Sequence, residues 1–144
     1  MRFTSSLLVA LIVCSCAPSH GAPTFSPAPP GPARPFSPAV SANGFLFLAG
    51  QLGTDNSGTV VAGGIQAETR QALENIRAVL QRHGLAMERV VKCTVFLADM
   101  KEWASMNEVY VTFFDPARRP ARSAMGTSGL ALNGRVEIEC IAAE

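Results

Sequence analysis

The chain has 144 residues, a formal net charge of +1 and 48% hydrophobic residues. This length accommodates a single globular domain, and the near-neutral charge excludes the strongly basic surface typical of nucleic-acid-binding proteins. Since the only histidines are His20 and His83 and no glycine-rich nucleotide-binding motif occurs, we expect no metal site, no cofactor and no nucleic-acid partner.

Residues 1–16 resemble a lipoprotein-type signal peptide. Arg2 precedes an apolar run over residues 7–13, which matches a secretory signal and is too short to span a bilayer. Residues 13–16, Val-Cys-Ser-Cys, resemble a bacterial lipobox, so we expect lipidation at Cys16. The protein is then periplasmic or held at a membrane through that lipid alone. Ordinary secretion with an imperfect cleavage site is the alternative.

Residues 17–35 are rich in proline, which cannot donate to a sheet ladder or continue a helix. We expect this segment to be an extended tether without a helix or ladder, followed by one domain over residues 36–144. Asn43-Gly44 then separates two apolar segments, Phe36–Ala42 and Phe45–Gln51. This dipeptide is the strongest short hairpin signal, so two paired strands open the domain.

A helix is predicted next, because apolar or small residues recur along one face up to Gly84, which ends it: Ile65, Thr69, Ala72, Leu73, Ile76, Val79, Leu80 and His83. A strand follows over residues 91–98, with Val91, Cys93, Val95 and Leu97 inward. Asp99 and Glu102 have the form of a helix N-terminal capping box. The second helix they begin has a predicted buried stripe of Trp103, Met106, Tyr110, Phe113 and Phe114.

Two more strands are predicted over Ala121–Gly126 and Val136–Ala142. The pattern indicates an α+β fold with one sheet of about six strands and both helices on one face, so oligomerisation is expected to cover the other face. Cys93 and Cys140 lie in strands and could form a disulfide in an oxidising compartment. We favour two buried apolar cysteines.

Arg122 and Glu137 are candidate partners. If the last two strands form a hairpin centred near Gly129 and Leu130, the two side chains lie opposite one another on one face. Arg118 and Arg119 are interpreted as a solvated basic cluster without a catalytic role.

Six motifs in this order resemble the reactive intermediate deaminase family, also called the Rid, YjgF-like or endoribonuclease L-PSP family. The resemblance covers about residue 36 to the C-terminus, and the motifs are Ala49-Gly50-Gln51, Gln71–Ile76, Val91–Leu97, Met106–Tyr110, Arg119–Ala124 and Val136–Glu139.

The resemblance implies a chorismate-mutase-like fold, a mixed sheet with two helices on one face, in a homotrimer with clefts between subunits. It implies hydrolysis of 2-imino acids or their enamine forms, such as those derived from 2-aminoacrylate, to 2-keto acids and ammonia without a cofactor. Arg122 corresponds to the arginine that binds the substrate carboxylate. Glu137 corresponds to an acid or water-orienting group, and the resemblance places four further residues around the substrate: Phe36, Gly50, Gln51 and Asn107.

This chain differs from the best-known branch of the family at four positions. It has Phe36 for tyrosine, Ala49 for serine, Ala124 for cysteine and Asn133 for proline. The alternative function is a non-catalytic or chaperone-like trimeric module that binds small carboxylates in the same cleft.

Overall fold

The computed structural model describes residues 21–28 and 34–144. The predicted signal segment, Cys16 and part of the predicted tether lie outside the described residues. Within the described ranges, no helix is both long enough and apolar enough to cross a membrane.

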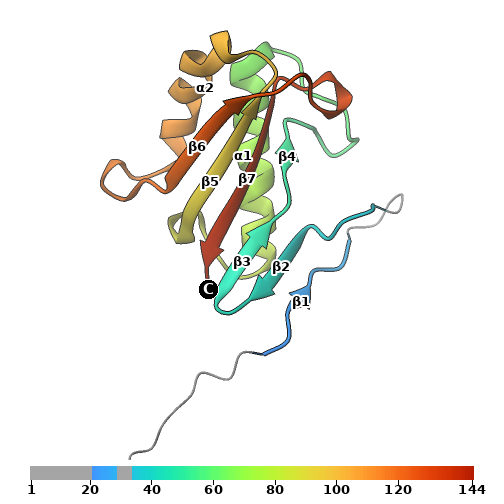
Figure 1. Cartoon of the computed structure of the whole chain (residues 1–144), viewed down its shortest axis with the longest axis vertical. Coiled ribbons are helices and arrows are strands. Elements are labelled where there is room, and N and C mark those ends of the chain that lie inside the picture. The colour runs from blue at the N-terminus through green and yellow to red at the C-terminus, as the bar shows by residue number, and fades with distance from the viewer. Residues whose placement is uncertain (1–20, 29–33) are drawn as a thin grey trace, which may run out of the picture.

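One mixed sheet carries two helices on one of its faces (Figure 1). The strands are β1 Thr24–Phe25, β2 Ala39–Ala42, β3 Phe45–Leu48, β4 Gln51–Leu52, β5 Val90–Leu97, β6 Ala121–Gly126 and β7 Val136–Ala143. The α-helices are α1 Gly64–Arg82 and α2 Trp103–Tyr110, and short 3₁₀ turns occupy Met87–Arg89, Met100–Glu102, Val111–Phe113, Pro116–Arg118 and Ala131–Asn133. The sheet order is β1-β2-β3-β7-β5-β6, and β4 also pairs with β7. The predicted α+β class is confirmed. Over the described residues the sheet has seven strands, because β1 is added and the predicted second strand is divided into β3 and β4.

The tether was expected to form no ladder, and for Thr24–Phe25 this is wrong. Both residues pair antiparallel with β2, and the Ser26 N–H donates to the Ala39 carbonyl at 2.9 Å. The Ser26 hydroxyl also lies 2.9 Å from Nε2 of His83, at the end of α1. Proline removes a donor only at its own position, so the residues between Pro23 and Pro27 remain free to pair at a sheet edge.

The predicted hairpin is confirmed, because β2 pairs with β3 directly across Asn43-Gly44. Asn43 has φ 52° and Gly44 has φ 77°, as a two-residue turn between twisted strands requires. α1 is also confirmed, and its apolar stripe is buried against the sheet up to Leu80. His83, expected on the same stripe, is half-buried, and Gly84 follows it with φ 69°.

The start of α2 departs from the prediction. The Asp99 carboxylate accepts the Lys101 N–H at 2.9 Å, as expected of a cap. The Glu102 carboxylate, however, binds the Arg135 guanidinium at 2.6 Å. In a capping box it would instead accept the backbone N–H of Asp99. Trp103 is 43% exposed, although we expected it in the buried stripe. A turn of 3₁₀ helix, Met100–Glu102, precedes Trp103 and rotates its side chain away from the core. Met106 and Tyr110 remain on the buried face of α2.

The expected hairpin between the last two strands does not form. β6 pairs in parallel with β5, and β7 lies between β3 and β5 as an antiparallel neighbour of both. A parallel pair needs a long crossover, and the segment from Ala98 to Pro120, which contains α2, supplies it.

The sheet register decides the state of the cysteines. Cys93 of β5 and Cys140 of β7 are directly opposite one another, and their sulfurs form a disulfide. Our preference for two free apolar thiols was therefore wrong. Periodicity showed that both residues face the core, but only the pairing of β5 with β7 makes them neighbours.

Candidate functional site

Arg122 lies in a hollow between β6 and α2. Its Cζ is 4.5 Å from the centre of the Tyr110 ring and 6.0 Å from that of Trp103, so two aromatic rings of α2 hold the guanidinium by cation–π contacts. The hollow has a volume of about 420 Å³ and is lined by Asn107, Tyr110, Val111, Arg119, Pro120 and Arg122.

The polar groups of this hollow have unused bonding capacity. Within the described part of the chain, no carboxylate forms an ion pair with Arg122. Oδ1 of Asn107 and the hydroxyl of Tyr110 are buried without a hydrogen-bond partner. Because buried unpaired polar atoms cost free energy, the arrangement favours a ligand that bonds to them. A guanidinium with free donors can bind a carboxylate in a bidentate manner.

Burial raises the pKa of Tyr110 from its ordinary value of 10.0 to about 12, and the positive charge of Arg122 opposes part of this rise. We expect the phenolate to appear near that pH in an absorbance titration after a rapid pH jump. Tyr110 is the single tyrosine, so the signal is unambiguous. Because the pKa is raised on folding, the contribution of neutral Tyr110 to stability is present below pH 10 and is lost as the pH rises towards 12.

Arg122→Gln provides the control for this titration. Removing the neighbouring positive charge should move the Tyr110 midpoint still higher. A midpoint near 10 in the wild type would show that Tyr110 is solvated in the folded protein.

Glu137 and Gly50 form a second polar region. Val136 and Ile138 of β7 are buried under the helices, so Glu137 projects from the helix-free face. A Cβ atom on Gly50 would lie 2.9 Å from Cδ of Glu137, so a side chain at position 50 would displace this carboxyl. Burial, and then the negative charge of Glu139, raise the pKa of Glu137. The Gln51 amide beside them donates to the Ala49 carbonyl at 3.0 Å.

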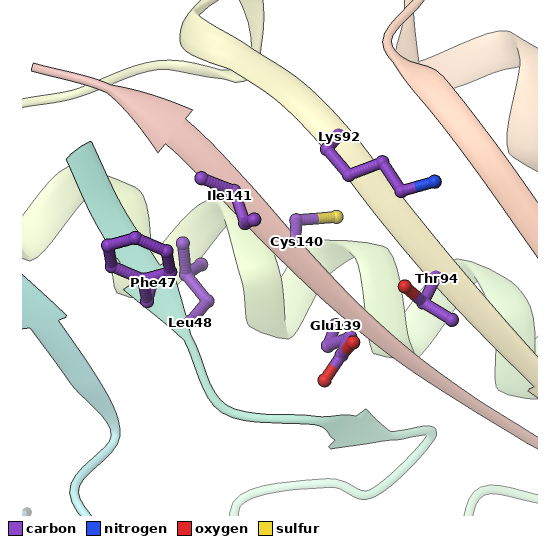
Figure 2. Close-up of a pocket in the computed structure, with 7 residues that line it drawn as sticks. All are labelled: Phe47, Leu48, Lys92, Thr94, Glu139, Cys140 and Ile141. Atoms are coloured by element: carbon purple, nitrogen blue, oxygen red, sulfur yellow. The ribbon is translucent and has the colours of Figure 1, made fainter.

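The helix-free face also carries a pocket of about 150 Å³, lined by Phe47, Leu48, Lys92, Thr94, Glu139, Cys140 and Ile141. Figure 2 shows Glu139 and Thr94 on the near side of β7 and β5, with α1 behind the strands. Nζ of Lys92 donates to the Ser123 hydroxyl at 2.9 Å. Phe45 and Phe47 are 42% and 44% exposed on this face, which makes it unusually apolar for a free surface.

Comparison with known proteins settles the family. The sequence model of the family described as endoribonuclease L-PSP matches residues 26–144. The chain belongs to the endoribonuclease L-PSP family. The resemblance found in the motifs is therefore confirmed, and the matched range includes part of the predicted tether.

Three relatives illustrate the range of the family. The mouse protein named 2-iminobutanoate/2-iminopropanoate deaminase is 40% identical over 116 residues, which cover 80% of this chain and 85% of the mouse protein. The Rid family protein YyfA from Yersinia pestis is 33% identical, with a TM-score of 0.79 over 85% of this chain and all (100%) of that chain. E. coli TdcF, solved with bound serine, is 33% identical, with a TM-score of 0.72 over 80% of this chain and 92% of that chain.

In this member of the endoribonuclease L-PSP family, the predicted site residues fall into three places. Asn107 and Arg122 share the hollow on the helix side of the sheet. Gly50 and Glu137 are in contact on the helix-free face, with Gln51 next to Gly50 in sequence. Phe36 is 52% exposed and precedes β2, which is far from β6 in the sheet order.

The expected juxtaposition of Arg122 and Glu137 within one chain is therefore wrong. β5 separates β6 from β7, and the two side chains leave opposite faces of the sheet. The expectation failed because it depended on the hairpin pairing that the parallel β5–β6 arrangement replaces.

Sequence reasoning missed two residues that line the hollow, Tyr110 and Arg119, as well as Trp103, which lies next to Arg122. Tyr110 and Trp103 were assigned to the core stripe, and Arg119 to solvent. The spacing of Asn107 and Tyr110, three apart on one helix, places both on the same side of α2 and was an available signal. Arg119 had no such signal, because only the folded position of the loop before β6 brings it to the hollow. Among the described residues, no cluster of histidine, cysteine, aspartate and glutamate could hold a metal ion.

Proposed function

We propose that this protein hydrolyses 2-imino acids, and the enamines in equilibrium with them, to 2-keto acids and ammonia. The observation that carries the proposal is Arg122, an arginine with free donors held on aromatic rings beside the unpaired Oδ1 of Asn107. The name of the mouse relative, at 40% identity, supports the same reaction class.

The reaction requires positioning more than activation, because the imine carbon is already electrophilic. Arg122 binds the substrate carboxylate, and Oδ1 of Asn107 accepts the imine N–H. Water attacks the imine carbon, the new C–O bond forms, and the nitrogen leaves as ammonia when the C–N bond breaks. Glu137 orients the attacking water or transfers a proton from that water to the departing nitrogen. The Gly50 backbone contacts the substrate or the same water. None of these steps uses a cofactor.

Two copies of the chain are needed for such a site. Arg122 and Glu137 leave opposite faces of one sheet, so a small substrate bound to Arg122 meets the Glu137 of a neighbouring copy. The apolar helix-free face supplies the surface for this association. We propose the homotrimer implied by the family, with three clefts between subunits.

A turnover assay tests the reaction. An amino-acid oxidase generates 2-imino acids in situ, and their disappearance is followed with the purified protein or with buffer. We expect the protein to accelerate the loss of imine and the release of ammonia. If the rate with wild-type protein equals that with buffer, the deaminase proposal fails. Binding of 2-keto acids without turnover would indicate the non-catalytic carboxylate-binding module instead.

Co-expression of two inactive variants tests the shared site. A site in a mixed assembly needs intact Arg122 from one chain and intact Glu137 from another. Random mixing of Arg122→Ala with Glu137→Gln in equal amounts therefore restores about one quarter of the wild-type sites. No recovery in demonstrably mixed trimers would show that the site does not combine these two residues from different chains.

The pH dependence of turnover reports on Glu137. Its pKa is raised by burial and by Glu139, so its acid form persists to a higher pH than that of an ordinary glutamate. We expect kcat/KM to fall as the pH rises through this raised pKa, and Glu137→Gln to be slower and to lack that decline. The measurement is a pH–rate profile of both proteins. The same descending limb in Glu137→Gln would assign it to another group.

We also propose that the protein is exported and lipidated at Cys16. The apolar run and lipobox-like sequence support this, and the Cys93–Cys140 disulfide is of the kind that persists in an oxidising compartment. Mass spectrometry of membrane fractions from the native host should detect a lipid on Cys16, and Cys16→Ala should release the protein to the soluble fraction. An unmodified chain that retains Met1 in the cytoplasm would overturn this proposal.

A further inference from the structure

The hollow that contains Arg122 has a second arginine, Arg119, on its wall. No aspartate or glutamate lines the hollow, and no described carboxylate forms an ion pair with either of these two arginines. Arg118, by contrast, pairs with Asp115 at 3.5 Å and does not line the hollow. The hollow thus carries two positive charges that no carboxylate in it balances. A bound 2-imino monocarboxylate would neutralise only one of them.

The spacing of the two arginines suits a ligand with two separated anionic groups. Arg119 has extended backbone angles, φ −66° and ψ 137°, and Arg122 follows three residues later in β6. At a rise of about 3.3 Å per residue, their Cα atoms are about 10 Å apart, and both side chains reach one hollow. Val111 and Pro120 line the hollow as well, so they provide an apolar wall for a short methylene chain.

Glu137 does not balance this charge in the proposed mechanism. A neighbouring copy brings it to the reacting carbon and the water, at the imine end of the substrate. Arg119 is therefore left without a partner when a monocarboxylate is bound.

We infer that the hollow selects 2-imino dicarboxylic acids, with the carboxylate next to the imine on Arg122 and the distal carboxylate on Arg119. This inference rests on the proposed function for its substrate chemistry. Arg119 is the specificity-determining residue, since planar guanidinium groups bind carboxylates through paired hydrogen bonds.

Ligand binding tests the inference without any turnover. Trp103 is the single tryptophan and lies 6.0 Å from Cζ of Arg122, so its fluorescence should report occupation of the hollow. The probes are the stable keto acids 2-oxoglutarate, a dicarboxylate, and 2-oxobutanoate, a monocarboxylate. We expect the wild type to bind 2-oxoglutarate on the order of 10- to 100-fold more tightly.

The variant Arg119→Gln should reduce this preference by about tenfold or more, and Arg119→Lys should retain part of it. Arg118→Gln is the matched control and should keep the wild-type preference. Equal affinities for the two probes in the wild type would overturn the inference, as would an unchanged preference in Arg119→Gln. Equal loss of both affinities in that variant would also overturn it, because Arg119 would then act as a general positive charge.

A kinetic comparison separates this inference from the proposed function. The 2-imino acids derived from glutamate and from 2-aminobutanoate are generated in situ and compared by kcat/KM. Turnover of both without a preference would refute the selectivity and leave the deaminase proposal intact. Absence of turnover, together with an Arg119-dependent preference for 2-oxoglutarate, would refute the deaminase proposal. It would leave intact the inference that the hollow selects dicarboxylates.

Discussion

Replacing Arg122 by lysine should lower kcat/KM for 2-imino acids by on the order of 100-fold, and alanine should lower it further. Lysine keeps the charge but cannot reproduce the planar fork that binds a carboxylate through two hydrogen bonds. It also stacks less well on the Tyr110 ring, which lies 4.5 Å from Cζ of Arg122. The measurement is the initial rate of imine loss over a range of substrate concentrations.

Arg118→Lys is the matched control for this prediction. Arg118 is exposed, pairs with Asp115 at the surface and lies outside the hollow, so its replacement should leave the rate within about twofold of the wild type. If Arg122→Lys is folded and turns over substrate as fast as the wild type, then Arg122 is not the carboxylate anchor.

Loss of the Cys93–Cys140 disulfide should lower the free energy of unfolding by about 4 kcal/mol. The two cysteines are 47 residues apart, and closing a loop of that length lowers the conformational entropy of the unfolded chain. At 25 °C this loss raises the free energy of the unfolded state by about 4 kcal/mol. Both side chains are buried in the centre of the sheet, so the bond also joins β5 directly to β7. Denaturant unfolding of the wild type with and without a reductant measures the effect.

The double variant Cys93→Ala, Cys140→Ala provides the control. Its stability should be low and the same in both conditions, because it has no core disulfide to reduce. Equal stability of the oxidised and reduced wild type would show that the bond contributes nothing to folding.

Local patterns predicted the elements well, because each depends on interactions within a few residues. Asn43-Gly44 strongly favours a tight turn through its own backbone angles, and the spacing of apolar residues before Gly84 predicts a helix with one buried face. The pairing of strands depends on contacts between distant segments. Nothing near Ala121–Gly126 indicates that it joins β5 rather than β7.

The assumed contact between Arg122 and Glu137 was wrong because it depended on a hairpin of β6 with β7. The preference for free thiols at Cys93 and Cys140 was wrong because no local pattern indicates that β5 pairs with β7. Arg119 was missed because its position depends on how the loop before β6 folds. The family resemblance assigned both Asn107 and Arg122 to the substrate site, and the structure brings the two residues into one hollow. Their separate patterns, as a helix amide and a strand arginine, did not indicate that they lie together.

The docking of β1 has a consequence for how the protein sits at a membrane. If Cys16 carries a lipid, only residues 17–23 separate the acyl chains from the first strand, a span of at most about 25 Å. A spacer reaching to residue 35 would have allowed more than twice that distance. In a threefold-symmetric assembly, the three anchors leave from equivalent positions, and their affinities for the bilayer combine multiplicatively. The trimer would then rest close to the lipid surface, attached there far more durably than any one acylated chain alone.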